Sequence, residues 1–138
     1  MFRKTPLAAA ILVLAASPVL ADNFSLQAQT GTENSALVEQ IGGRANAAQA
    51  QSGFRNDAQS AQVGSAGSVG QLQIGDFNQL EADQYRAGAG SLIKQFQDGH
   101  HNDGQASQFG GRANSITQFQ QGHGNDSSVV QLGGAHNS

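Results

Sequence analysis

Small or apolar residues alternate with polar residues in short segments along most of the chain. In residues 34–40 one set of alternate positions carries only amide, small or apolar side chains, which are Asn34, Ala36, Val38 and Gln40. The intervening positions include Glu39, and the same alternation recurs over 78–84 and 125–131. A period of two residues is typical of a β-strand with one buried face. The pattern predicts an all-β protein with strands of about seven residues.

Glutamine recurs through the chain at a spacing close to eleven residues, and this repeat organises the alternating segments. The spacing is strict from Gln29 to Gln95, slips by two residues to Gln97, and slips by one more before Gln120. The predicted series of stacking glutamines is Gln29, Gln40, Gln51, Gln62, Gln73, Gln84, Gln95, Gln108, Gln120 and Gln131.

Asparagine and glycine hold fixed places around these glutamines. Asparagine stands six residues before most of them, at Asn23, Asn34, Asn56, Asn78, Asn102, Asn114 and Asn125. Ala45, Gly67 and Ala89 take that place in the other three units. Glycine stands two residues after nearly every glutamine, at Gly31, Gly42, Gly53, Gly64, Gly75, Gly99, Gly110, Gly122 and Gly133. Each unit, N-x-a-x-a-x-Q-x-G-x-x, predicts a strand followed by a four-residue turn whose glycine adopts a positive φ.

The buried amides favour coiling of these strands over a meander of hairpins. A buried Gln or Asn side chain is costly unless its amide is hydrogen-bonded. If two units form one strand–turn–strand rung of 22 residues, identical amides stack about 4.8 Å apart and bond to one another. The prediction is a cross-β solenoid of about five rungs, with a thin core that includes Ala36, Ala47, Ala58, Ala82 and Ala106.

Disorder is the alternative interpretation, because Gln- and Asn-rich chains are often disordered and prone to aggregate. Ten units in phase, with alternating faces and a phased glycine, argue against a scattered low-complexity tract. The sequence leaves open whether the monomer folds before it assembles.

The first 21 residues have the features of a secretory signal peptide. Arg3 and Lys4 precede an apolar run over residues 7–14, and small residues at Val19 and Ala21 predict cleavage before Asp22. This run is shorter than the roughly 20 residues that span a bilayer. We therefore expect an exported chain with one repeat domain at 22–138 and no transmembrane segment.

Charge and cysteine content narrow the choice of function. Without Arg3 and Lys4 the chain keeps five cationic and ten acidic residues, which disfavours nucleic-acid binding. It has no cysteine, so no disulfide can stabilise it.

The repeat begins directly after the predicted cleavage site, and only seven residues follow Gln131. We expect no cap at either end, so that the open edges pair with identical molecules and form a filament. The acidic residues expected to slow premature assembly are Asp57, Glu81, Asp83, Asp103 and Asp126.

The unit N-x5-Q-x-G-x-x-N-x5-Q, as in residues 23–40, resembles the curlin repeat of bacterial curli subunits, and the likeness extends over residues 23–137. The resemblance implies a secreted structural subunit of amyloid fibres that serve in adhesion and biofilm formation. It also implies that the subunit reaches the cell surface through the periplasm. It implies self-assembly, an outer-membrane secretion pore with accessory factors, and a nucleator or partner curlin subunit. The chain lacks the Gly-rich leader of the familiar major subunit and the basic last repeat of the nucleator. A nucleator-type minor subunit and a monomeric β-solenoid adhesin stay open as alternatives.

Other chemistry finds little support in the sequence. His100, His101, His123 and His136 fall in or near predicted turns without partners at ligand spacing. Glu81 and Asp83 are expected on the outward face of a strand, where no pocket is implied. We therefore predict a protein that is not an enzyme, with no catalytic residues, no metal site and no cofactor.

Overall fold

The computed structural model describes residues 22–64, 66–86 and 89–138, and these residues form ten β-strands. The predicted signal peptide, residues 1–21, lies outside the described residues. The strands are β1 (Phe24–Thr32), β2 (Ser35–Ile41), β3 (Asn46–Phe54), β4 (Asp57–Val63), β5 (Ser68–Asp76), β6 (Gln79–Tyr85), β7 (Leu92–His100), β8 (Asp103–Phe109), β9 (Ser115–His123) and β10 (Asp126–Leu132).

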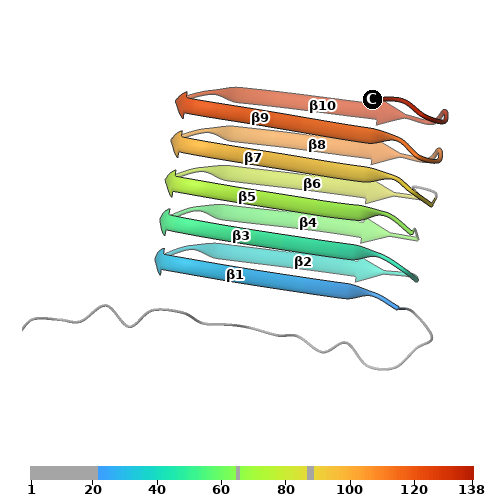
Figure 1. Ribbon diagram of the computed structural model, residues 1–138, viewed down its shortest axis with the longest axis horizontal. Coiled ribbons are helices and arrows are strands. Elements are labelled where there is room, and N and C mark those ends of the chain that lie inside the picture. Colours follow the sequence, from blue (N-terminus) through green and yellow to red (C-terminus); the bar gives the residue numbers. More distant parts are fainter. Residues whose placement is uncertain (1–21, 65, 87–88) are drawn as a thin grey trace, which may run out of the picture.

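The strands form two parallel five-stranded sheets that lie face to face (Figure 1). One sheet has the order β1-β3-β5-β7-β9 and the other has the order β10-β8-β6-β4-β2. We call them the odd sheet and the even sheet. Each rung is one odd strand, a turn and the following even strand, so the chain climbs through five rungs. The all-β prediction and the prediction of a β-solenoid with about five rungs are confirmed.

Strand pairing keeps like residues above one another. Gln29 pairs with Gln51 in the next rung, and Gly31 pairs with Gly53. Equivalent residues are 22 positions apart between the first rungs, 24 apart between Gln73 and Gln97, and 23 apart between Gln97 and Gln120. A shift of one residue would turn every inward side chain outward, so the inward amides fix this register.

The space between the sheets is narrow and contains few large side chains. Val69, Ala82, Ile93, Ala106 and Ile116 form the apolar cluster at its centre. Of the alanines predicted for the core, Ala36 lies half-buried in the first rung and the others, Ala47, Ala58, Ala82 and Ala106, are buried. Small residues permit close approach of the two sheets, and the remaining interior is filled by amides.

The two kinds of strand and turn differ, which the single eleven-residue unit did not predict. Odd strands have nine residues and even strands have seven. Odd strands connect to even strands through two residues, as at 33–34, along what we call the short-turn edge. Even strands connect to odd strands through longer segments along the long-turn edge, on the opposite side of the solenoid (Figure 1). The predicted four-residue turn is therefore found only at the long-turn edge, in the connections 42–45 and 64–67.

Extra residues enter only at the long-turn edge. Its connections are 42–45, 64–67, 86–91 and 110–114, whereas every connection at the short-turn edge has two residues. The predicted slip between Gln95 and Gln97 is wrong, because the two added residues precede β7. Both glutamines lie in β7, and pairing within a strand leaves no room for an insertion.

Across the described ranges, no helix is long and apolar enough to cross a membrane.

Candidate assembly site

Two columns of glutamine run parallel to the solenoid axis, one in each sheet. In the even sheet each Nε2 donates to Oε1 of the next rung at 2.9–3.0 Å, through Gln40, Gln62, Gln84, Gln108 and Gln131. In the odd sheet the same bonds measure 2.7–3.2 Å, through Gln29, Gln51, Gln73, Gln97 and Gln120. Nine of the ten predicted glutamines lie in these two columns.

Each column also joins the two sheets. The Nε2 of Gln84 donates to the backbone oxygen of Ser68 at 3.2 Å, and that of Gln73 donates to the backbone oxygen of Asp57 at 2.9 Å. One amide nitrogen thus bonds both along the axis and across the core. The side chains of Gln73 and Gln84 have 0% exposure, and their hydrogen bonds offset the cost of burying them.

The tenth predicted glutamine, Gln95, belongs to a third column that sequence reasoning missed. Its Oε1 accepts from Gln71 at 2.9 Å and its Nε2 donates to Gln118 at 2.7 Å. The whole column is Gln27, Gln49, Gln71, Gln95 and Gln118. The sequence does contain a pattern that identifies this column: every odd strand has the motif Q-x-Q, whereas each even strand has one inward glutamine. Aligning the Q-x-Q motifs of successive odd strands places the two-residue insertion before Gln95.

A continuous asparagine column follows the short-turn edge. The Oδ1 of Asn56 accepts both the backbone N–H of Asn78, at 3.1 Å, and its side-chain Nδ2, at 3.1 Å. The Nδ2 of Asn78 also donates to the backbone oxygen of Gly99 at 2.9 Å. These contacts repeat through Asn34, Asn56, Asn78, Asn102 and Asn125. The column holds every turn of this edge to the turns of neighbouring rungs.

The corresponding column at the long-turn edge is interrupted. It contains Asn23, Ala45, Gly67, Ser91, Asn114 and Asn137, so the predicted seven-asparagine series divides between two edges. Ser91, and not the predicted Ala89, takes the place in the fourth rung because of the two added residues. Asn137 was missed; its backbone N–H donates to Oδ1 of Asn114 at 3.1 Å. At Gly67 a Cβ would lie 2.3 Å from Oε1 of Gln84, so a larger residue there would displace the Gln84 amide from its column.

All nine predicted turn glycines have positive φ. Those of the short-turn edge in the first four rungs carry a second constraint, which the sequence did not reveal. A Cβ on Gly53 would lie 1.9 Å from the carbonyl oxygen of Gly75, and one on Gly75 would lie 2.0 Å from that of Gly99. Glycine is required here by the close stacking of backbones as well as by the turn conformation.

Non-glycine residues also adopt positive φ at the short-turn edge, which was not predicted. Arg55 has a φ of 55°, Phe77 of 58° and His101 of 56°. This conformation costs an L-residue about 1–2 kcal/mol. Their side chains contact one another along the axis: Arg55 pairs with Glu33 and lies over the Phe77 ring, and Phe77 stacks on His101 at 4.9 Å.

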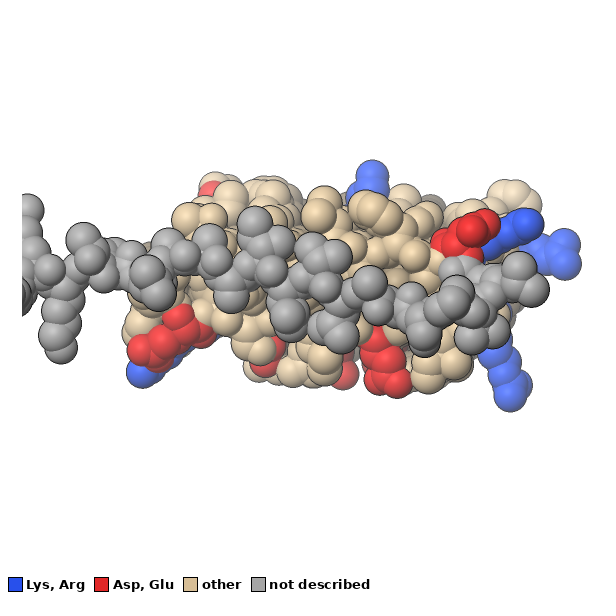
Figure 2. All heavy atoms as spheres, turned by 90° about the horizontal axis from the view of Figure 1, so that it is seen from below, with Lys and Arg blue, Asp and Glu red and all other residues tan. Residues whose placement is uncertain are grey.

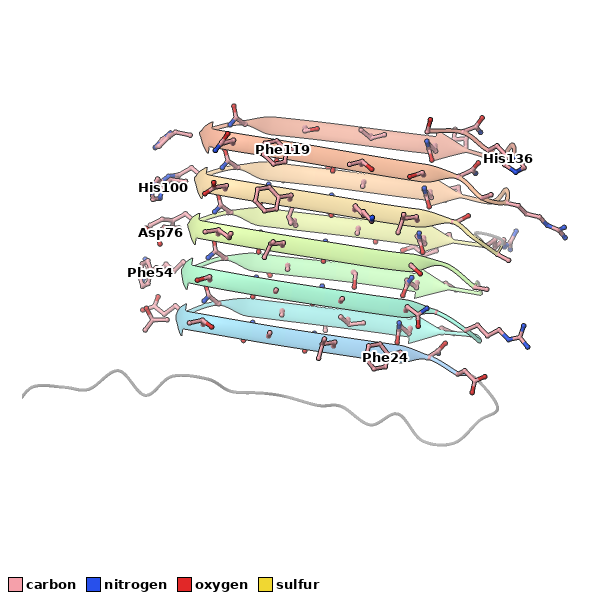
Figure 3. The ribbon with its side chains drawn as sticks, in the orientation of Figure 1. Phe24, Phe54, Asp76, His100, Phe119 and His136 are labelled. Carbon is pink, nitrogen blue, oxygen red and sulfur yellow. The ribbon has the colours of Figure 1, made fainter. Side chains whose placement is uncertain are left out.

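The predicted turn histidines lie at the edges of the solenoid. His100 and His123 are aligned at the short-turn edge, where Nδ1 of His100 lies 3.4 Å from Oδ2 of Asp76, while His136 lies at the long-turn edge (Figure 3). In the described ranges, no group of three or more His, Cys, Asp or Glu side chains is arranged to hold a metal ion. These histidines contribute to the aligned side chains of an edge.

The outer face of the even sheet is acidic. Its strands carry no Lys or Arg, and their outward carboxylates are Glu39, Asp57, Glu81, Asp83, Asp103 and Asp126. Acidic side chains gather on one long side of the cross-section seen along the axis (Figure 2). Burial raises the pKa of Asp83 above its ordinary value, and the nearby Glu81 raises it further. The pKa of Tyr85 is raised chiefly by the charge of Asp83.

The first and fifth rungs present complementary groups to solvent. Among the described residues, no donor bonds to Oε1 of Gln27, Gln29 or Gln40 in the first rung. In the fifth rung Nε2 of Gln118, Gln120 and Gln131 donates only to groups of the even sheet or the odd sheet across the core, which leaves one N–H of each for the direction of the axis. Three amide acceptors at one end therefore match amide donors at the other.

Comparison with known proteins gives no relative: no protein-family model, curated protein or solved structure matches this chain.

Proposed function

We propose that this protein is a structural subunit of an extracellular fibre, and that it polymerises by stacking its fifth rung on the first rung of the next copy. The observation that carries the proposal is that the two end rungs are chemically complementary. The arrangement inside the molecule repeats every rung, so a second copy can extend it without any new kind of contact.

The register of such a junction follows from the strand pairing. Placing β1 on β9 and β2 on β10 in the internal register aligns Gln118 with Gln27, Gln120 with Gln29 and Gln131 with Gln40 of the next copy. The short-turn column continues as well, from Asn125 to Asn34. The three glutamine columns and the short-turn asparagine column are continuous across the junction, and β9 and β10 pair with β1 and β2 of the next copy. At the long-turn edge Asn137 already lies over Asn114, so there it takes the place of the next copy's Asn23.

The wider role rests on the resemblance to curlin repeats. We propose that the chain is exported, passes through an outer-membrane secretion pore with accessory factors, and assembles at the cell surface as an adhesive and biofilm-forming amyloid. Two sheets with aligned edges, held together by buried amide columns, support a structural role. A nucleator-type subunit and a monomeric β-solenoid adhesin are the competing roles that the assembly experiment separates.

The first test is assembly of purified residues 22–138, followed by thioflavin-T fluorescence and fibre diffraction. We expect growth after a lag, shortening of the lag by preformed seeds, and reflections near about 4.7 and 10 Å. A folded monomer that never elongates at high concentration would overturn the fibre role and favour the adhesin. A chain that elongates only on seeds of a different curlin-like subunit would still be a fibre subunit, with a separate nucleator.

A single substitution tests the junction itself. Phe24 N–H donates to the oxygen of Ala45 in the second rung, so by strand alternation the N–H of Ser25 points to the open edge. Ser25→Pro removes that donor without removing a bond inside the solenoid, and proline is tolerated on edge strands. We expect a folded chain that elongates at least tenfold more slowly, whereas Ser25→Ala elongates at the original rate. Equal rates for both variants would exclude this junction.

A further inference from the structure

The outer face of the odd sheet differs from that of the even sheet in being apolar and almost uncharged. Its central column of outward residues is Ala28, Ala50, Leu72, Phe96 and Phe119. Phe96 and Phe119 stack with their ring centroids 4.9 Å apart and their planes at 5°. Phe119 is 65% exposed and projects from β9 (Figure 3). An apolar column that ends in an exposed aromatic ring indicates a contact surface.

Small residues hollow this face beside the central column. A groove of about 460 Å³ lies over Ala48, Ala50 and Gly70 and is bordered by Leu26, Lys94 and Phe96. On the other side of the central column stands Ile74, which is 40% exposed. The face therefore has a depression and a projection at equal distances from its centre, two positions to either side of Leu72.

Two opposite charges occupy equivalent places. Each odd strand has four outward positions before its turn glycine, and in these positions Lys94 and Asp98 are the charged residues. Both lie on β7, two residues to either side of Phe96, with the exposed Lys94 on the hollow side and the half-buried Asp98 on the Ile74 side. The face is thus self-complementary in both shape and charge about the Phe96 column.

We propose that this face binds the same face of a second copy, with a two-fold axis parallel to the solenoid axis along the column of Ala28, Leu72 and Phe119. This operation places each rung opposite the same rung of the second copy, with the strands antiparallel across the interface. Lys94 of each copy then faces Asp98 of the other. Ile74 faces Gly70 and enters the hollow, and Phe96 faces Phe96.

The area available is sufficient for a specific contact. Nine residues at about 3.3 Å and five strands at about 4.8 Å give a face of roughly 700 Å², or about 1,400 Å² buried by the pair. Specific protein interfaces bury about 1,200–2,000 Å². The outer face of the even sheet cannot pair with itself in this way, because its six carboxylates have no cation on the strands to face. The face of the odd sheet is the one that a second copy can cover.

Lateral pairing of two stacks through this face is compatible with elongation of the fibre. An axis parallel to the stacking direction keeps two stacks parallel, so both lengthen in the same direction and every added copy meets a partner at the same height. In this respect the inference rests on the proposed stacking. It predicts fibres built of two laterally paired stacks.

The test is the mass per length of fibres formed by residues 22–138, measured by scanning transmission electron microscopy, with the cross-section seen by cryo-electron microscopy. A single stack contributes one chain per five rungs, or one chain in about 24 Å. We expect two chains per 24 Å. Fibres with one chain per 24 Å would overturn the pairing and leave the stacking intact, whereas failure to form any fibre would count against the proposed function.

Charge exchange identifies the interface. Lys94→Asp places two carboxylates opposite each other in both halves of the pair, and Asp98→Lys similarly opposes two ammonium groups. Each single variant should form fibres with half the mass per length. The double variant Lys94→Asp/Asp98→Lys restores opposite charges and should restore paired stacks. Gln105→Asp, an exposed substitution on the even sheet, should leave pairing unchanged. Single variants that stay paired, or a double variant that stays single, would exclude the proposed interface.

Discussion

The short-turn edge and the long-turn edge close the same five rungs, but they constrain the sequence differently. The short-turn edge has a two-residue turn in every rung, an unbroken asparagine column and glycines whose backbones nearly touch. The long-turn edge varies from four to six residues, as in 64–67 and 86–91, and its column accepts alanine, glycine and serine. This difference indicates that regular stacking requires turns of constant length and geometry at one edge, whereas the other edge tolerates insertions.

Physical chemistry explains the difference. At the short-turn edge four of the five asparagines bond within their own turn and all five bond to a neighbouring rung, so any change of length would break contacts in two rungs. At the long-turn edge the connections range from four to six residues, and the entropy of closing a loop rises only slowly with its length. The solenoid therefore keeps its register through insertions that would be destructive at the opposite edge.

Among single substitutions, the largest expected effect comes from adding a methyl group to a stacked glycine. Gly75→Ala places Cβ 2.0 Å from the oxygen of Gly99 at a φ of 109°. We expect a loss of about 3 kcal/mol or more, from strain of about 1–2 kcal/mol and overpacking of about 1–3 kcal/mol. Gly64→Ala at the long-turn edge, with φ of 73° and nothing within 4 Å of the Cβ, should show the strain alone. Urea unfolding of the monomer, or of fibres, measures both; equal losses would remove the distinction between the edges.

The next effect comes from interrupting an asparagine column. Asn78→Ala removes the bonds to Asn56 and Gly99 and leaves groups of Asn102 unsatisfied in the interior. The expected loss is about 2–4 kcal/mol, because several buried polar groups lose their partners. Asn114→Ala, equally buried but in the interrupted column, should cost about 1 kcal/mol for its bonds to Gly133 and Asn137. Denaturation midpoints give both values, and a larger loss at Asn114 would contradict this order.

Changing the length of a connection separates the two edges directly. Deletion of Ala87 and Gly88 returns the 86–91 connection to the four residues that close the first two rungs, so we expect a change within about 1 kcal/mol. Insertion of two glycines between Phe77 and Asn78 should abolish the register of the third rung. Circular dichroism and thermal unfolding report the outcome. If the insertion were tolerated and the deletion were destructive, the long-turn edge, and not the short-turn edge, would be the one that requires a constant length.

The smallest effect is a pH dependence at the short-turn edge. Burial raises the pKa of Asp103 above its ordinary value of 3.8, and the charge of Asp126 raises it further. Oδ1 of Asp103 is buried without a hydrogen-bond partner among the described residues. The folded chain therefore binds this proton more readily than the unfolded chain, and its stability should increase as the pH falls from neutral through the raised pKa towards 3.8.

Asp103→Asn tests this dependence. The variant should be more stable than the original chain at neutral pH and should lose part of the stabilisation on acidification. Asp98→Asn, on the outer face of the odd sheet, is the control and should leave the acid stabilisation in place. The measurement is the urea midpoint between pH 7 and pH 4. An unchanged pH dependence in Asp103→Asn would exclude this carboxyl as its source.

Much of the fold could be predicted from the repeat, and the parts that could not have a common cause. The alternation in residues 78–84 placed Asn78, Leu80, Ala82 and Gln84 on one face, and all four are buried. Treating every unit as equivalent hid the distinction between odd and even strands. For that reason Gln95 was assigned to the wrong column and Ala89 was placed where Ser91 lies.

The sequence by itself determined that this chain coils, since amides and glycines in fixed phase can be satisfied and accommodated only when like residues stack. It also determined the number of rungs. The tertiary structure decided which edge is precise, where insertions are absorbed, and how the two outer faces differ. Those properties depend on distances between residues more than twenty positions apart, such as Gly75 and Gly99. An eleven-residue pattern read along one strand does not contain them.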